Sequence, residues 1–294
     1  MKISVIGVQM DFGASKRGMN IGPLAIRYAG LCEKLEAMGF EVRDEGDIVP
    51  IALPEIDGRM KNFASIKEAN ERLHMKVKES LAAGSFPVVL GGDHSLSAGS
   101  VSAVREHFGD IGVVWIDAHG DFNNDVSSGS GNMHGMPLSA LCGFGPDNMV
   151  TFGKAPLYVD PAKVVLVGGR DFDPEERARL KASGVTVFCI SNIDRMGMGA
   201  VMERAIDIAG RGTKGIHLSF DIDAVCPEGA PGVGTPVHSG LTLRESFLAA
   251  ELLCESQKLL SIDMVEINAI IDDNNKTALL ATELILSALG KTVY

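Results

Sequence analysis

Three apolar stretches of the sequence end in acidic and imidazole side chains that could bind metal ions together. The stretches are "VVLGGDHS", "VVWIDAHGDFN" and "LSFDIDAV". They supply, in order, Asp93 and His94, then Asp117, His119 and Asp121, and finally Asp221 and Asp223. Because side chains two positions apart in a strand share a face, each stretch can aim its ligands at one place.

Closely spaced carboxylates repel one another and are unfavourable to bury unless a multivalent cation neutralises them. Carboxylate and imidazole donors without a thiolate favour a hard or borderline ion such as Mn²⁺. The donors exceed the needs of one ion, so two ions sharing bridging carboxylates are expected. Such a pair activates a water molecule as a hydroxide nucleophile, which is hydrolytic chemistry.

Each of these residues also has an ordinary structural interpretation when it is taken alone. A single aspartate after a strand is usually a helix N-cap, and Asp93 fits that role well. A single histidine is usually a satisfied core or surface group. The metal hypothesis therefore depends on six residues occurring together: His94, Asp117, His119, Asp121, Asp221 and Asp223.

Alternating strand and helix patterns predict the elements that position these ligands. Short β-branched apolar runs predict strands within 2–8, 86–92, 111–117, 164–169, 185–191, 215–223 and 261–267. Helical patterns lie between them at 23–38, 66–83, 174–182, 241–255 and 276–289. Strand followed by helix, repeatedly, predicts one α/β domain over residues 1–294 with a mostly parallel sheet. Ligands in such sheets bind outside the carboxyl ends of the strands, which is where the acidic residues lie.

Composition narrows the class of protein. The 294 residues are 46% hydrophobic, and the formal net charge of −11 argues against binding nucleic acid. The five cysteines are widely spaced without a CxxC pair, which argues against a disulfide framework or a structural zinc site. No apolar run is long enough to span a membrane, and the N-terminus lacks a signal-peptide pattern, so a soluble cytoplasmic enzyme without membrane association is expected.

The motifs "GGDHS", "DAHGD", "SGNMHG", "SFDID" and "GTP", in that order, resemble the signatures of the ureohydrolase family and, within it, of the arginases. The resemblance extends from "IGVQMDFGASKRGMNIGPLAIRYAG" to "VEINAIIDDNNKTA". It implies an arginase-like, three-layer α/β/α fold, two Mn²⁺ ions per subunit and hydrolysis of L-arginine to L-ornithine and urea. It also implies a homo-oligomer, a hexamer or a trimer.

The same resemblance assigns the ligands. One Mn²⁺ would be held by His94, Asp117, Asp121 and Asp221, and the other by Asp117, His119, Asp221 and Asp223. Asp117 and Asp221 would therefore bridge the two ions.

The resemblance further implies which residues serve the substrate. His134 would move protons between the site and solvent, Asp121 could protonate the departing nitrogen, and Glu266 would pair with the guanidinium group. The remaining substrate contacts would be Asn123, Ser130 and Asn132 at the α-carboxylate, Asp173 and Glu176 at the α-amino group, and Thr235 in the wall. Asp173 and Glu176 have a competing role, because an aspartate before Pro174 with a glutamate three positions later is a helix-capping pattern.

One position departs from the family pattern. Ureohydrolases usually carry "DxDxxDP" after the last metal strand, whereas this chain reads "DIDAVCP", with Cys226 in place of the third aspartate. Losing the hydrogen bonds of that aspartate would weaken metal affinity by about 10- to 100-fold.

Four other functions compete with arginine hydrolysis. An agmatinase or guanidinobutyrase would keep the metals but lack the amino-acid contacts, and a deacetylase of the same fold type would not need His94 and Asp121. A catalytically silent scaffold would not need the complete set of ligands. A calcineurin-type phosphoesterase is disfavoured because "GNMH" only superficially resembles its GNH motif.

Overall fold

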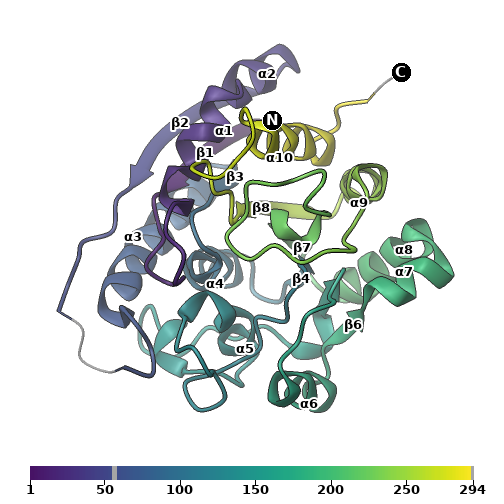
Figure 1. Cartoon of the computed structure of the whole chain (residues 1–294). Helices are drawn as coiled ribbons and strands as arrows, with labels where there is room; N and C mark the ends of the chain where they lie inside the picture. The colour runs from purple at the N-terminus through teal and green to yellow at the C-terminus, as the bar shows by residue number, and fades with distance from the viewer. Residues whose placement is uncertain (55–57, 293–294) are drawn as a thin grey trace.

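A computed structural model describes residues 1–54 and 58–292 and contains one eight-stranded sheet in which every strand is parallel to its neighbours. The strand order is β2-β1-β3-β8-β7-β4-β5-β6 (Figure 1). The strands are β1 (Lys2–Val8), β2 (Glu41–Ile48), β3 (Ser85–Leu90), β4 (Gly112–Ile116), β5 (Val164–Val167), β6 (Thr186–Phe188), β7 (Ile216–Asp221) and β8 (Leu259–Val265). This arrangement confirms the predicted α/β class and parallel sheet.

Helices cover both faces of the sheet. They are α1 (Gly22–Tyr28), α2 (Leu31–Ala37), α3 (Phe63–Ala82), α4 (Ser97–Phe108), α5 (Pro137–Leu141), α6 (Pro174–Ser183), α7 (Ile190–Met196), α8 (Met198–Gly210), α9 (Leu243–Glu255) and α10 (Lys276–Ala288). Helices α1, α2 and α7 to α10 lie on one face of the sheet and α3 to α6 on the other (Figure 1). An apolar core joins each set of helices to its face of the sheet. The molecule therefore has three layers, with two cores separated by the sheet.

The seven predicted strands are all present, but β2 is an eighth that the apolar pattern did not predict. Its sequence "EVRDEGDI" is mostly charged, and only its last residue is buried. Strand β2 lies at the edge of the sheet, where one row of backbone groups faces solvent and charged side chains are tolerated.

The helix predicted over 23–38 is wrong as a single element. The chain breaks it into α1 and α2 at Gly30, whose φ of 82° is left-handed and unsuited to a helix interior. By contrast, the helix predicted over 241–255 is present as α9. Thr242 caps its start, because the Thr242 hydroxyl accepts from the backbone N–H of Glu245 and the Glu245 carboxylate accepts from Thr242 N. No helix in the described ranges is long and apolar enough to cross a membrane.

Candidate metal centre and substrate cavity

The predicted ligands meet at the carboxyl ends of four adjacent central strands, β3, β8, β7 and β4. His94 begins the short 3-10 helix that follows β3, and Asp117 directly follows β4. Asp221 is the last residue of β7, and Glu266 directly follows β8. Parallel strands bring their ends to one edge, so the topology assembles the site as the sequence predicted.

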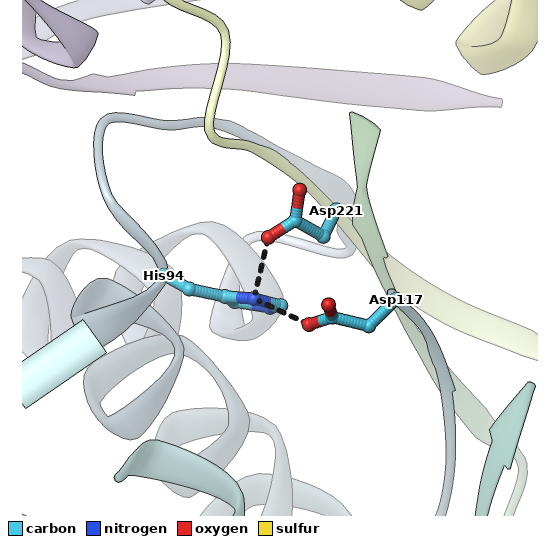
Figure 2. A group of neighbouring side chains, drawn as sticks. All are labelled: His94, Asp117 and Asp221. Carbon is cyan, nitrogen blue, oxygen red and sulfur yellow. Dashed lines mark ion pairs between the residues drawn. The ribbon is translucent and has the colours of Figure 1, made fainter. Parts of the chain in front are cut away.

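The first group of ligands surrounds the Nδ1 atom of His94. This atom lies 3.2 Å from Asp117 Oδ2, 3.2 Å from Asp221 Oδ2 and 3.0 Å from Asp121 Oδ2. Figure 2 shows the carboxylates of Asp117 and Asp221 converging on the edge of the His94 ring. All four side chains are buried.

The second group shares Asp117 with the first. His119 Nδ1 lies 3.4 Å from Asp117 Oδ1 and 3.0 Å from Asp223 Oδ2. Asp117 therefore turns one carboxylate oxygen to each group, which is one of the arrangements open to a bridging ligand. Asp221 lies with the first group, and its Oδ1 accepts a hydrogen bond from Asp223 N at 2.8 Å.

The ligands after β4 converge through a turn rather than through strand pleating, which differs from the expected geometry. The strand ends at Ile116, and Asp121 adopts a left-handed conformation with φ of 49°. Asp117 Oδ1 accepts from the backbone N–H of His119 at 2.7 Å, which curls the chain. The side chains at 117, 119 and 121 thus face the same site because the backbone bends back on itself.

Electrostatics show how unfavourable this cluster is without a cation. Burial and the charge of Asp117 raise the pKa of Asp121 to about 6. Burial together with Asp223 and Asp117 raises the pKa of Asp221 well above its usual range. Burial opposes charge on His94, yet the surrounding carboxylates raise its pKa well above the ordinary value. The site therefore favours bound positive charge, either protons or metal ions.

Unpartnered atoms test whether a metal fits here. Among the described residues, His94 Nδ1 and Asp121 Oδ2 are both buried and form no hydrogen bond, although they lie 3.0 Å apart. Such atoms are unfavourable to bury without a partner. A divalent cation bound by the two groups would satisfy both atoms, so the donor set fits the expected metal pair.

A buried histidine and glutamate pair adjoins the ligands. His134 Nδ1 lies 3.0 Å from Glu266 Oε1, which also accepts from the backbone N–H of His94 at 2.8 Å. Glu266 Oε2 is buried and forms no hydrogen bond within the described residues. Burial lowers the pKa of His134, but the charge of Glu266, with Asp93 and Asp121, outweighs it and raises the pKa to about 9.

A cavity of about 200 Å³ opens over the ligands. Its wall contains most of the predicted catalytic and substrate residues, namely Asp121, Asn123, Ser130, Asn132, His134, Asp173, Glu176 and Thr235. Thr235 Oγ1 donates to Asp223 Oδ2 at 3.1 Å, and Asn123 Nδ2 donates to Asp173 Oδ2 at 3.0 Å. Glu266 is 1% exposed and is absent from this wall.

The sequence analysis did not single out three of the residues that line the cavity: Gly135 and two with polar side chains, Asp171 and Ser128. Asp171 lies two positions before Asp173 in "RDFDPEE", and Ser128 precedes Ser130 in the loop. Period-two spacing from Asp173 was the available signal for Asp171. Ser128 had no distinguishing signal, because its hydroxyl acts through the loop, accepting from Gly131 N at 3.0 Å.

Glu176 ties the metal segment to the start of α6. Its Oε1 accepts from Phe122 N at 2.8 Å, and its Oε2 accepts from Asp173 N at 3.3 Å. Gly120 leaves room for this carboxyl group, because a Cβ at position 120 would lie 2.7 Å from it and would displace it. Capping and positioning thus occupy both oxygens of Glu176. Its predicted contact with the substrate amino group stays a prediction.

We expect Glu176 to make folding stability depend on pH. Burial, assisted by Asp121 and opposed by the hydrogen bond from Phe122, raises the pKa of Glu176 from 4.5 to about 7. A raised native pKa means that the folded chain holds a proton that the unfolded chain releases, so the stabilisation is present below pH 4.5 and lost by about pH 7. The unfolding free energy of metal-free wild type should therefore decline across this window relative to that of Glu176→Gln.

Denaturant unfolding at a series of pH values measures the difference. Glu175→Gln, the exposed neighbour on the same helix, is the matched control and should follow wild type. Parallel pH profiles for wild type and Glu176→Gln would contradict the expectation.

Cys226 does not reach the metal ligands. Its thiol donates to Glu228 Oε2 at 2.7 Å. Asp223 instead accepts from Ala118 N and Thr235 Oγ1, at 3.3 Å and 3.1 Å. The surrounding loop is held by Arg170, which donates to the backbone carbonyls of residues 168, 223, 224, 237 and 238. The loop therefore has an anchor that does not depend on an aspartate at position 226.

Comparisons with known proteins identify relatives of this chain along its whole length. The model of the arginase family matches residues 1–290. An arginase of Bacillus subtilis (strain 168) is 46% identical over 292 residues, covering 98% of both chains. The native structure of Bacillus caldovelox arginase has a TM-score of 0.96 and 43% identity, covering 99% of both chains. Entamoeba histolytica arginase, solved in complex with L-ornithine, has a TM-score of 0.90 and 31% identity, covering 99% of both chains.

Proposed function

Because the chain belongs to the arginase family, we propose that it hydrolyses L-arginine to L-ornithine and urea with two Mn²⁺ ions bound. The observation that carries the proposal is the pair of ligand groups sharing Asp117 at the base of the cavity. The two groups supply carboxylate and imidazole donors only, which suits Mn²⁺. The Entamoeba relative, whose structure contains L-ornithine, supports the choice of substrate.

The ligand sets follow the family resemblance. His94, Asp117, Asp121 and Asp221 would hold one ion. Asp117, His119, Asp221 and Asp223 would hold the other. When bound, two such ions act as Lewis acids that activate a water molecule for attack at neutral pH.

Residues around the ligands would orient the substrate. The unpartnered Oε2 of Glu266 can accept from the guanidinium group, and the buried charge strengthens that contact. Asp173 would bind the α-amino group, and its hydrogen bond from Asn123 fixes the carboxylate in place. Asn123, Ser130 and Asn132 would donate to the α-carboxylate. Thr235, which lies in the cavity wall, donates to Asp223.

His134 would transfer protons between the substrate and solvent. With Nδ1–H donated to Glu266 Oε1, Nε2 is the atom that exchanges protons with the substrate and solvent. The carboxylate of Glu266 is the largest cause that raises the pKa of His134, to about 9 in the metal-free protein, and this pairing would favour a protonated ring that can donate to the departing nitrogen of ornithine. Asp121 would be the alternative donor.

A urea-release assay with Mn²⁺ tests the proposal, using arginine, agmatine and 4-guanidinobutyrate in parallel. Agmatine lacks the α-carboxylate. Guanidinobutyrate lacks the α-carbon together with its amino group, so its carboxylate lies one carbon closer to the guanidinium group than in arginine. Arginine should have the highest kcat/KM. A preference for agmatine or guanidinobutyrate would replace arginase by another ureohydrolase activity while keeping the same chemistry.

We expect two variants to lower two different selectivity ratios. Asp173→Asn removes the charge that pairs with the amino group, so the ratio of kcat/KM for arginine over guanidinobutyrate should fall by about 10- to 100-fold. Asn132→Ala should instead lower the ratio of arginine over agmatine. Each variant serves as the control for the other, and equal changes in both ratios would contradict the assignment of these contacts.

Three further expectations complete the proposal. Residues 1–294 would form one catalytic domain. The protein would be a cytoplasmic homo-oligomer, either a hexamer or a trimer. It would act on a small-molecule substrate without binding nucleic acid or a membrane.

A further inference from the structure

A hydrogen-bonded series of buried polar side chains begins at His94 and leads away from the cavity. His94 Nδ1 faces the carboxylates of the site, whereas its Nε2 lies 2.8 Å from Ser219 Oγ. The His94 ring stacks on Trp115, with the ring centroids 4.0 Å apart and an angle of 10° between the ring planes. The imidazole therefore has one nitrogen for the metal centre and one for the interior of the protein.

The hydrogen-bonded series continues through two hydroxyl groups, those of Ser219 and Ser97, to the carboxylate of Asp263. Ser219 Oγ lies 3.3 Å from Ser97 Oγ, and Ser97 Oγ donates to Asp263 Oδ2 at 2.8 Å. Ser100 donates to the same oxygen, and His217 Nε2 lies 3.3 Å from it. Every one of these side chains is at most 1% exposed.

Three elements bring these residues together. Asp263 lies within β8 directly beside Ser219 of β7 in the strand register. Ser97 and Ser100 lie in the first turn of α4, which packs against this face of the sheet. A carboxylate and several hydroxyls in a core are unfavourable unless they are hydrogen-bonded, and apolar side chains would fill the same space without that requirement. The arrangement therefore calls for a function.

The hydrogen bonds between His94 and Asp263 can be donated in only one direction, from the histidine toward the carboxylate. A carboxylate only accepts, so Ser97 must donate its single hydroxyl proton to Asp263. Ser97 can then only accept from Ser219, and Ser219 can only accept from His94 Nε2. This order places the proton of a neutral His94 on Nε2 and leaves the lone pair on Nδ1, the nitrogen that faces Asp117, Asp121 and Asp221.

We propose that Asp263 is a remote positioning residue for the metal centre, acting through Ser97 and Ser219 to fix the tautomer and orientation of His94. The inference rests on the metal-binding part of the proposed function. Partners behind a metal-binding histidine characteristically set its tautomer and raise its basicity. Here that partner is reached through two hydroxyls instead of by direct contact.

Mn²⁺ affinity measured by calorimetric titration tests the proposal. Ser97→Ala removes the hydroxyl that links Ser219 to Asp263, and Asp263→Asn replaces the carboxylate at the end of the series. The dissociation constant for Mn²⁺ at the His94 group should rise by about 10- to 100-fold in each variant. Ser102→Ala is the matched control. Ser102 is also buried on α4, but its hydroxyl forms no hydrogen bond within the described residues. Its variant should bind Mn²⁺ as wild type does.

A second measurement separates positioning from general support of the fold. The imidazole ¹⁵N shifts of His94 in Zn²⁺-loaded protein should change in Ser97→Ala and stay unchanged in Ser102→Ala. A lower melting temperature of metal-free Ser97→Ala with unchanged affinity and ¹⁵N shifts would overturn the proposal. If Asp263→Asn does not fold, Ser97→Ala decides. If wild type binds Mn²⁺ and the variants change its affinity as expected, but wild type releases no urea, the proposed function is contradicted and the positioning role is not.

Discussion

Replacing Asp117 by Asn should reduce kcat/KM for arginine by at least about 100-fold, because losing even an indirect partner of a metal ligand lowers affinity or activity by about 10- to 100-fold. Asp117 directs one oxygen toward His94 and the other toward His119. Asparagine offers one oxygen, so one of the two groups loses its shared ligand. Urea release and bound Mn²⁺ per subunit should fall together, and this pairing distinguishes loss of a bridge from loss of a substrate contact.

The fold should survive the Asp117→Asn substitution. The asparagine keeps the size of the side chain and one of its two acceptor oxygens, so only one hydrogen bond is lost of the two that Asp117 accepts, from the Trp115 indole N–H at 2.9 Å and from His119 N at 2.7 Å. Asp110→Asn is the matched control, an exposed aspartate just before the same strand, and should retain wild-type turnover. An Asp117→Asn protein with two bound ions and normal turnover would exclude the bridging role.

Replacing His134 by Ala should lower kcat by about 100- to 10,000-fold, the usual contribution of a positioned proton donor. KM for arginine should change much less, because the predicted contacts to the carboxylate and amino groups remain. Steady-state kinetics give both parameters. The ratio of bound Mn²⁺ to protein should match wild type, since His134 is not among the predicted ligands.

His107→Ala controls for the loss of an imidazole, because His107 is exposed on α4 away from the ligands. A His134→Ala variant whose KM rises while kcat is kept would show a binding role for His134 in place of proton transfer.

Sequence patterns predicted the sheet well and the helices less completely. Apolar β-branched runs marked every buried strand, because central parallel strands are covered on both faces. Four helices escaped notice, and α4 shows why. Its sequence "SAGSVSAVREHF" combines serine and glycine, which favour helices weakly, with a nearly uniform burial that removes the alternation of polar and apolar faces. Tertiary packing, which local sequence does not encode, selects helix there.

The candidate site was predictable where strand ends supplied it and unpredictable where loops did. All six predicted metal ligands are brought together, since parallel topology aligns the ends of strands distant in the chain. The turn at Asp121 was not predictable, because nothing in the motif indicates a left-handed aspartate. The buried carboxylate of Asp263 was equally hidden, since one acid within the apolar run "LLSIDMV" has no local pattern that distinguishes it.

The bond between Glu176 and Phe122 limits how this protein could acquire a new specificity. The same carboxylate fastens the turn that carries Asp121 and the helix start that carries Asp173. An engineer who reshapes the beginning of α6 to accept a substrate without an amino group would also disturb a metal ligand. Changes to substrate range and to metal binding are therefore coupled through Glu176. A successful redesign must first supply another hydrogen-bond acceptor for Phe122 N and Asp173 N and only then alter the pocket.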